Sequence, residues 1–378
     1  MPGIAAEQRT KMMLEDPISK VIPHLAFPTI ISMLVSSIYN MADTYFVSQI
    51  GTSASGAVGV IFSAMSIIQA VSFMFGMGAG TNVSQALGAR DDERAQRFAS
   101  TAFFTAFATG IVIAVVCNLS IDPLVRFLGA TETIVPYAKD YASYIFYAAP
   151  FMMCSFVMNN LLRFEGLAFY GMIGIASGGI LNMVLDPLLI FGLNLGTAGA
   201  AIATAFSQLV SFCILLVMTN RQPGAIAIRM KDFTPRLQVY KRIIYNGFPS
   251  LGRQGIASVS TILLNTTAGA YGDAAIAAMS IVSRFVMFIN SSVIGFGQGF
   301  QPVCGFCFGA GKYSRVRQAY TYCIKVCTVV LLVLGVVSFV FAEQIVTLFR
   351  RDDLQVIGSA PWRCGCSCVP CPCGPTSP

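Results

Sequence analysis

The chain has 378 residues, of which 55% are hydrophobic and 11% are charged, and its mean hydropathy is +0.70. This composition excludes a soluble globular protein and is typical of an integral membrane protein. The net charge of +7 does not indicate a nucleic-acid-binding surface, because the Lys and Arg residues lie in short segments between apolar runs.

Nine apolar runs are each long enough for a membrane-spanning helix of about 20 residues, and Gly, Pro or charged residues separate them. They cover residues 21–50, 54–86, 98–119, 134–162, 168–193, 197–219, 239–270, 274–308 and 319–342. The first run follows a polar N-terminal segment and is too long for the apolar part of a signal peptide, so we expect it to remain as a helix. Pro28 lies one or two turns inside it and is a predicted kink point.

Lys and Arg are unequally distributed between alternate connecting segments. If the N-terminus is cytoplasmic, sixteen of the 24 basic residues lie in inner segments and four in outer segments. The excess of positive charge in cytoplasmic loops therefore predicts a multi-pass protein of the cell membrane with its N-terminus inside. Residues 220–238, a basic segment with two prolines, are predicted to be a cytoplasmic linker.

The two halves of the chain repeat each other at a constant offset of 221 residues, without a gap over some 70 positions. The offset pairs Phe27-Pro28 with Phe248-Pro249, Gly51 with Gly272, Gly88-Ala89 with Gly309-Ala310, and Arg94 with Arg315. Six crossings separate equivalent points, so both halves have the same orientation. We expect an axis along the membrane normal between them, and a central cleft.

The sequence thus predicts an all-α integral membrane protein with two six-helix lobes, the second incomplete, so that about nine full helices of an expected twelve are present. The predicted regions are an N-terminal cytoplasmic segment (1–20), the N-lobe (21–219), the linker (220–238), a partial C-lobe (239–360) and a tail (361–378). The tail holds five Cys and five Pro where a helix is due. Its Cys spacing fits a small metal-binding segment, whereas the abrupt change fits truncation followed by a shifted reading frame.

Two acids lie within the apolar runs. An Asp at a helix centre costs roughly 2.5 to 3.5 kcal/mol on insertion scales, so Asp43 is expected to face a cavity, a cation or a proton partner. Asp186 shares a helix face with Asn182, four residues earlier. Counted from the helix ends, Asp43, Asp186 and Thr204 all lie roughly 12 Å inside the outer boundary. This common depth predicts one cation site, in which Tyr39, one turn from Asp43, can hydrogen-bond to that carboxylate.

The alternative is that both acids lie at helix mouths in contact with water and never meet. Other polar residues in the runs are candidates for a substrate cleft: Gln208, Gln254, Arg253, Arg284 and Asn265. Arg163 and Glu165 are expected to pair with each other at a helix end. No nucleotide-binding loop, HExxH motif or nucleophile elbow is present, so we expect neither an enzyme nor a cofactor.

Pro28, Asp43 and Gly51 in the first run, the Gly88-Ala89-Arg90 segment and the repeat after a basic linker resemble the multidrug and toxic compound extrusion (MATE) family. The resemblance covers residues 20–360. The set that matches the N-lobe cation site of prokaryotic members, residue for residue, is Tyr39, Asp43, Asn182, Asp186 and Thr204. Leu264 stands at the repeat partner of Asp43, so coupling is expected in the first half alone.

The resemblance implies a secondary antiporter, expected as a monomer, that exports cationic or amphipathic small molecules in exchange for Na⁺ or H⁺. Bending at Pro28 is expected to accompany protonation. Two alternatives stay open. The first is a flippase for a lipid-linked saccharide with the same double-lobed plan, which predicts a cleft richer in Arg and Lys. The second is a non-functional truncated fragment, which the Cys- and Pro-rich tail favours.

Overall fold

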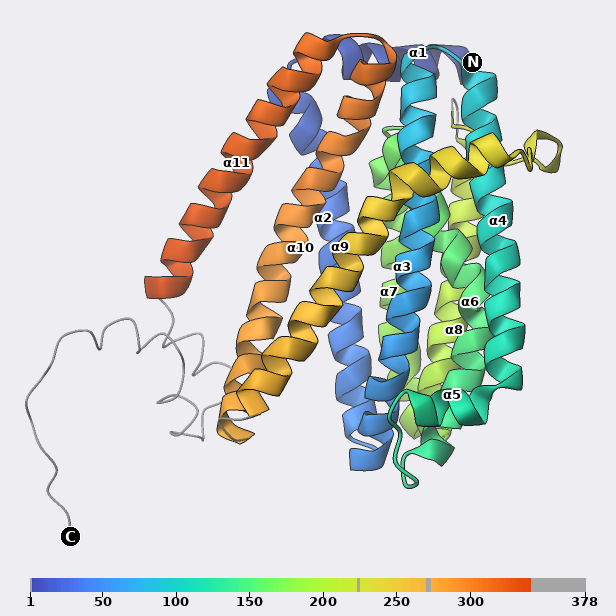
Figure 1. The fold of residues 1–378 in the computed structure, drawn as a ribbon, viewed down its shortest axis with the longest axis vertical. Coiled ribbons are helices and arrows are strands. Elements are labelled where there is room, and N and C mark those ends of the chain that lie inside the picture. The colour runs from blue at the N-terminus through green and yellow to red at the C-terminus, as the bar shows by residue number, and fades with distance from the viewer. Residues whose placement is uncertain (1, 223–224, 270–272, 341–378) are drawn as a thin grey trace, which may run out of the picture. The chain divides into compact units, whose positions relative to one another are not determined.

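The computed structural model describes residues 2–222, 225–269 and 273–340, and within these ranges it is helical without strands (Figure 1). The long helices are α2 (Ile18–Ser48), α3 (Thr52–Gly88), α4 (Asp92–Leu119), α6 (Val135–Phe164), α7 (Ala168–Pro187), α8 (Gly196–Arg221), α9 (Leu237–Gly269), α10 (Asp273–Gly309) and α11 (Tyr313–Val340). Shorter elements are α1 (Pro2–Glu15), α5 (Ile121–Phe127), the π-helical turn η1 (Leu188–Gly192) and the 3₁₀ turn η2 (Met230–Asp232).

The nine predicted runs correspond to the nine long helices of the described residues, with ends that differ by six residues at most. Seven helices in the described ranges are long and apolar enough to cross a membrane. A difference of six residues occurs at the start of α4, at the end of α7 and at the start of α11, and the first has a clear local cause. At the start of α4 the Asp91 side chain accepts a hydrogen bond from the Arg94 backbone N–H at 3.0 Å, and Asp92 and Glu93 lie in the first turn. Acids at a helix N-terminus are stabilising, so the helix extends beyond its apolar part.

Helix α1 lies in the segment that sequence analysis described only as polar, and tertiary contacts explain it. Met13 is fully buried in a cluster with Val303 and Phe306 of α10. The backbone oxygens at its end accept hydrogen bonds from Arg315, whose Nε lies 3.1 Å from the Met13 oxygen, and from Lys312. Cationic side chains at a helix C-terminus satisfy its free carbonyls and complement its dipole.

Among the described residues, those up to 255 together with 294–324 form one compact unit, and 256–269, 273–293 and 325–340 form another. In the first unit, α6 is the central helix and packs against α3, α4, α7 and α8 (Figure 1). Its apolar span is 78% buried, against 28–44% for the other spans of the first lobe. The helix is buried on nearly every side, so it can hold polar groups away from lipid.

The repeat is visible in the backbone. Shifting the end of α3, Gly88, by 221 residues gives Gly309, the end of α10. After both helices the next residue but one has a left-handed conformation, Arg90 with φ 60° and Gly311 with φ 71°. Equivalent hydrogen bonds close both helix ends, as in a Schellman motif. After α3 the Asp91 N–H donates to the Ala86 oxygen (2.9 Å), and after α10 the Lys312 N–H donates to the Cys307 oxygen (2.8 Å).

The contact between α3 and α10 is symmetric in the same way. A Cβ atom on Gly88 would lie 2.2 Å from the carbonyl oxygen of Phe306, and one on Gly309 would lie 2.0 Å from that of Gln85. Gln85 and Phe306 are themselves repeat partners. Glycine is required at both positions because the two backbones touch there.

The predicted pair of Arg163 and Glu165 is wrong. Arg163 donates to the side-chain oxygens of Asn160 and Gln298, at 2.6 Å to Asn160. Glu165 Oε2 instead accepts a hydrogen bond from the Ile226 N–H at 3.0 Å. The two side chains leave the helix end in different directions, since one is the next-to-last residue of α6 and the other already belongs to the connection.

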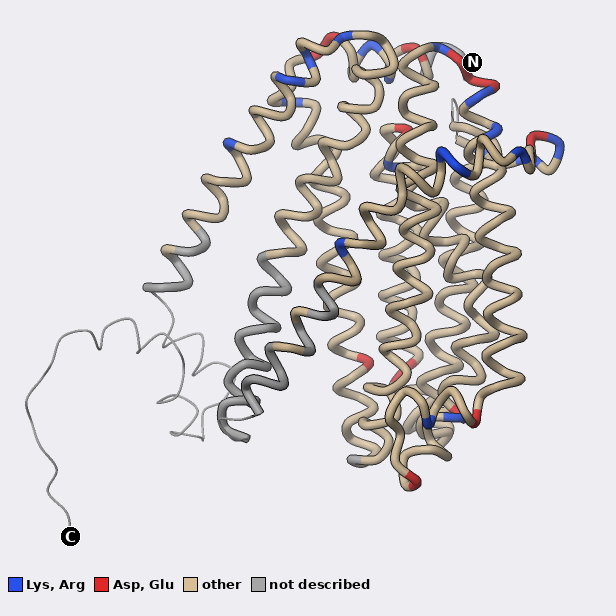
Figure 2. The backbone as a smooth tube through the Cα atoms, in the orientation of Figure 1, with Lys and Arg blue, Asp and Glu red and all other residues tan. Residues whose placement is uncertain are grey.

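Charged residues are segregated along the first lobe. Figure 2 shows that most Lys and Arg of the helices between residues 18 and 221 gather at the end of the bundle where the N-terminus lies, while their middle parts carry few charges. This agrees with the unequal count in the sequence. The assignment of that end to the cytoplasm stays a prediction.

Several predictions lie outside the described residues: the end of the partial C-lobe (341–360), the Cys- and Pro-rich tail, and the side chains of Arg284, Asn265 and Leu264. Helix α2 continues through Pro28. The kink at Pro28 and its bending stay predictions.

The left-handed residue after α3 generates a stability prediction. For an ordinary L-residue this conformation costs roughly 1 to 2 kcal/mol, and glycine avoids the cost. Because Arg90 is exposed, Arg90→Gly should raise the midpoint of thermal unfolding in detergent, and Gly311→Ala, at the repeat partner, should lower it. Equal midpoints for Arg90→Gly and the parent chain would contradict the shared turn.

Glu165, between two membrane spans, generates a pH prediction. Burial raises the pKa of this carboxyl from 4.5 to about 7, although the charge of Arg9 and the Ile226 N–H act in the opposite direction. The folded protein then binds more protons than the unfolded chain between these values, so this group's contribution to stability is lost as pH rises from about 4.5 to about 7. Glu165→Gln should remove this loss, worth roughly 3 kcal/mol at most, in unfolding measured from pH 5 to 8.

The matched control is Glu132→Gln in an exposed loop. The Arg126 guanidinium lowers the pKa of Glu132. That ion pair therefore contributes stability above the usual carboxyl pKa, and the substitution should slightly lower stability at neutral pH. If Glu165→Gln also lowered stability at pH 8, burial would not be the dominant effect on Glu165.

Candidate functional site

The predicted site residues come from helices of the first lobe that pack on one another. Asp43 and Tyr39 lie on α2, Asn182 and Asp186 on α7, and Thr204 on α8. Helix α7 contacts both α2 and α8. Immediately after Asp186, Pro187 ends the α-helix and η1 follows as a π-helical turn. Pro has no N–H to continue the α-helical pattern, and such π turns are frequent at functional sites.

Asn182 connects α7 to α8. Its Nδ2 donates to Asp186 Oδ1 at 3.1 Å and to Thr204 Oγ1 at 3.2 Å. These three side chains are buried, with exposed fractions of 2%, 0% and 6% for Asn182, Asp186 and Thr204. A single amide donor therefore holds a carboxylate and a hydroxyl from neighbouring helices together.

Asp43 reaches the same place from α2 through Tyr141 of α6. The Tyr141 hydroxyl donates to Asp43 Oδ2 at 3.5 Å, which is a long hydrogen bond. Tyr141 also interacts with Asp186 and Thr204, and the charges of Asp43 and Asp186 act on each other. The structure thus brings both acids together, and the alternative of two separate helix mouths does not describe this arrangement.

Tyr141 is the residue that sequence analysis missed. It lies six residues after Val135, at the start of α6, so the depth count applied to the other helices would have placed it near the level of the acids. Tyr39 lies one turn before Asp43 on α2, and the described residues show no hydrogen bond between these two side chains. The predicted hydrogen bond of Asp43 is made by the phenol of α6.

Three acceptor oxygens of the cluster make no hydrogen bond to a described residue: Asp43 Oδ1, Asp186 Oδ2 and Asn182 Oδ1. A buried polar atom without a partner costs about 1 to 3 kcal/mol, more for a charged group. Oxygen atoms without donors are ligands for a hard cation or acceptors for a proton. The arrangement can therefore bind one positive charge between α2 and α7.

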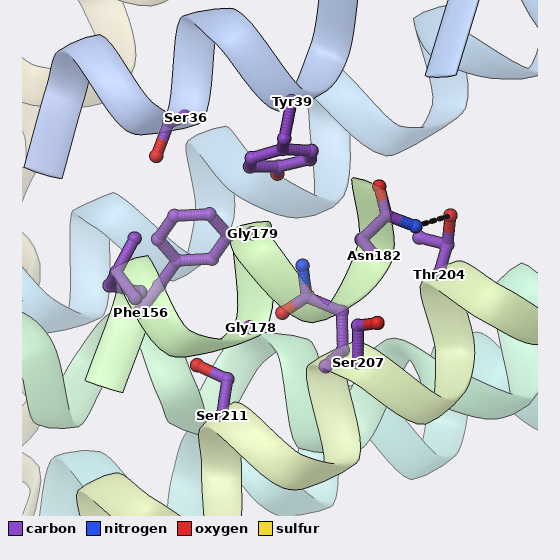
Figure 3. A pocket seen from close by; sticks show the side chains of 11 residues that line it. Ser36, Tyr39, Phe156, Gly178, Gly179, Asn182, Thr204, Ser207 and Ser211 are labelled. Carbon is purple, nitrogen blue, oxygen red and sulfur yellow. Dashed lines mark hydrogen bonds between the residues drawn. The ribbon is translucent and has the colours of Figure 1, made fainter. Parts of the chain in front are cut away.

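A small cavity of about 20 Å³ lies beside the cluster, enough for one water molecule. Tyr39, Asn182, Thr204, Ser207 and Gln208 line it. In Figure 3, Tyr39 of α2, Asn182 of α7, and Thr204 and Ser207 of α8 surround it, with the Asn182–Thr204 hydrogen bond at one side. Asn182 and Thr204 belong to both the cluster and the wall of this cavity, and Ser207 and Gln208 continue that wall along α8.

The residues predicted to line one substrate cleft do not share a cavity. Gln208 lines this small cavity, and Arg253 of α9 lines a larger one between α3, α9 and α10. Gln254 lines neither of these two cavities. Arg284 and Asn265 belong to the side chains that the structure does not describe.

Multidrug export proteins of two staphylococci resemble the chain over most of its length. The multidrug export protein MepA of Staphylococcus haemolyticus is 28% identical over 344 residues, 91% of this chain and 76% of that protein. MepA of Staphylococcus aureus (strain MSSA476) is 27% identical over 340 residues, 90% and 75% of the two chains.

Solved structures of transporters also resemble this chain over most of its length. The crystal structure of MATE in complex with MaL6 superposes with a TM-score of 0.87 at 29% identity, covering 93% of this chain and 79% of that one. A MOP superfamily transporter from Pyrococcus furiosus gives a TM-score of 0.85 at 30% identity, with 93% and 78% covered.

The family model MatE matches residues 28–188 and again residues 249–359, and its second match begins 221 residues after the first, at the offset of the repeat. The two matches cover most of the chain. With its helices, its repeat and its polar cluster as described, this chain belongs to the MatE family.

Proposed function

We propose that this protein is a secondary active antiporter that exports drugs or other cationic or amphipathic compounds in exchange for Na⁺ or H⁺. Transport proceeds by alternating access between the two lobes. The names of the relatives, multidrug export proteins, support the substrate class. They favour export of such compounds over the flipping of a lipid-linked saccharide.

The observation that carries this proposal is the buried pair of Asp43 and Asp186. Two carboxylates that interact in a membrane interior repel each other, and each retains an oxygen without a donor. A proton or a Na⁺ ion relieves both costs. The cation binds between α2 and α7, so its binding changes the attraction between two helices of the first lobe. A coupled conformational change requires such a difference in interaction between the ion-bound and ion-free states.

In this proposal Asp43 and Asp186 carry the charge of the coupling ion. Asn182 and Thr204 supply neutral oxygens, and Tyr141 orients Asp43. Tyr39 closes the small cavity on the side of α2. Binding of the cation accompanies release of the substrate outward, and its discharge inward resets the protein.

Transport tests the assignment. In proteoliposomes, Asp43→Asn and Asp186→Asn should each abolish gradient-driven efflux of a fluorescent organic cation, since neither amide can carry the ion's compensating charge. Separate Na⁺ and H⁺ gradients identify the ion. The control is Asp140→Asn, an exposed acid beside Tyr141 on the same helix, which should retain efflux. Full efflux by Asp43→Asn would refute the coupling site.

Substitution of Tyr141 on α6 tests the proposed cation site more specifically. Tyr141→Phe removes a donor that stabilises the ion-free Asp43 carboxylate by about 0.5 to 1.5 kcal/mol, so the ion concentration for half-maximal efflux should fall about two- to tenfold. Tyr144→Phe, one turn away and 40% exposed, should change nothing. Equal ion dependence of the two variants would show that Tyr141 does not affect ion binding.

A further inference from the structure

A cavity of about 420 Å³ lies between α3, α9 and α10, apart from the acids of α2 and α7. This volume is in the range of pockets that bind small organic molecules. The residues that line it are Met77, Thr81, Gln85, Phe164, Asn246, Pro249, Ser250, Arg253, Phe300, Gln301, Cys304, Gly305 and Phe308. All of them belong to the unit formed by residues 1–255 and 294–324.

The charge of this cavity is positive. Arg253 lines it with an exposed side chain, and the described lining residues include no Asp or Glu. The neighbouring acid of Phe164, Glu165, directs its Oε2 to the Ile226 N–H and interacts with Arg9. A cationic ligand in the cavity would therefore find a like charge and no carboxylate among the described walls.

A second guanidinium lies behind the wall. Arg163 is 3% exposed, and one of its terminal nitrogens contacts Met77 Sδ at 3.0 Å and Gln301 Oε1 at 3.5 Å, both residues of the lining. Its other hydrogen bonds go to Asn160 and Gln298, which are neutral amides. A buried cation that has only neutral partners keeps its field, and in a low-dielectric wall that field extends into the cavity.

The rest of the lining fits a molecule with an apolar ring system and a hydrogen-bonding end. Phe164, Phe300 and Phe308 supply aromatic surface. Ser250, 9% exposed, has a hydroxyl that makes no hydrogen bond to a described residue. Rotation about its χ1 brings that donor to a ligand, which would remove the cost of leaving it unpaired.

We propose that this cavity binds an amphipathic molecule with an aromatic body and one anionic group, a carboxylate or a phosphate, anchored by Arg253. The inference rests on the export function proposed above and concerns the amphipathic compounds among its substrates, not the organic cations. The coupling cation and an anionic substrate then occupy separate sites of opposite charge, so binding of one does not require displacement of the other's ligands.

Equilibrium binding tests this without any gradient. The purified full chain in nanodiscs of zwitterionic lipid is titrated with pyrenebutyrate, with its methyl ester, and with a pyrenyl-butyl trimethylammonium ion of the same ring. The carboxylate should bind about tenfold or more tightly than the ester, since a charge-assisted hydrogen bond to Arg253 is lost in the ester. The cation should bind more weakly than either.

Variants locate the site. Arg253→Gln should weaken binding of the carboxylate about tenfold and leave the ester within about twofold, while Arg253→Lys should retain most of the preference for the anion. Ser250→Ala should weaken binding without lowering thermal stability, which a merely structural hydroxyl would not do. The matched control is Arg317→Gln, an exposed arginine of α11 outside the cavity, and it should bind all three probes as the parent does.

Equal affinity for carboxylate and ester, tighter binding of the cation, or an unchanged preference in Arg253→Gln would overturn the proposal. Asp43→Asn separates it from the export function: binding should persist in this variant while gradient-driven efflux is lost. Phosphatidylglycerol added to the nanodiscs distinguishes the source of the anion. Displacement of pyrenebutyrate supports the site with a lipid headgroup as its ligand, and retention supports it with a soluble one.

Discussion

The cost of placing charge in a membrane interior governs this structure. Asp43 and Asp186 lie in helices that are otherwise apolar, and the protein gives them only neutral donors: the amide of Asn182 and the phenol of Tyr141. Such partners orient a carboxylate without neutralising it. The acids stay responsive to a cation because no Lys or Arg in the described part of the chain forms a salt bridge with them.

Arg163, a buried positive charge, likewise has only neutral hydrogen-bond partners. Its guanidinium is surrounded by the amides of Asn160, Gln298 and Gln301. If Glu165 had paired with it, as its place in the sequence suggests, the two charges would have cancelled and the neighbouring cavity would be neutral. The structure instead keeps Arg163, Asp43 and Asp186 out of salt bridges with other described residues, and neutral groups hold each of them. Separate charges of this kind suit a protein whose ligands are themselves charged.

The duplicated backbone provides the scaffold on which these sites differ. The turn after α3 and the turn after α10 share their hydrogen bonds and their left-handed residue, and the glycine contacts of the two helices are related by the same offset. Side chains are free to diverge once the backbone contacts are satisfied. Asp43 has Leu264 as its repeat partner, so a symmetric framework carries an acid cluster in its first half.

Hydropathy, the repeat and the depth of the acids are properties of short or regularly spaced segments. The sequence by itself therefore determined the nine long helices, the doubling of the lobes, and the group of Asp43, Asn182, Asp186 and Thr204. Periodicity and a rise of about 1.5 Å per residue are enough for such inferences.

Only the tertiary structure decided which groups touch. Helix α1 forms because Lys312 and Arg315, some 300 residues away, satisfy its last carbonyls. Tyr141 faces Asp43 across 98 residues, and Arg163 contacts Gln298 across 135. These are contacts between helices, set by rotation of each helix about its axis and by the close approach of α3 and α10 at glycine. The rotation of a helix cannot be predicted from its own residues, because it results from the packing of the helix against all of its neighbours.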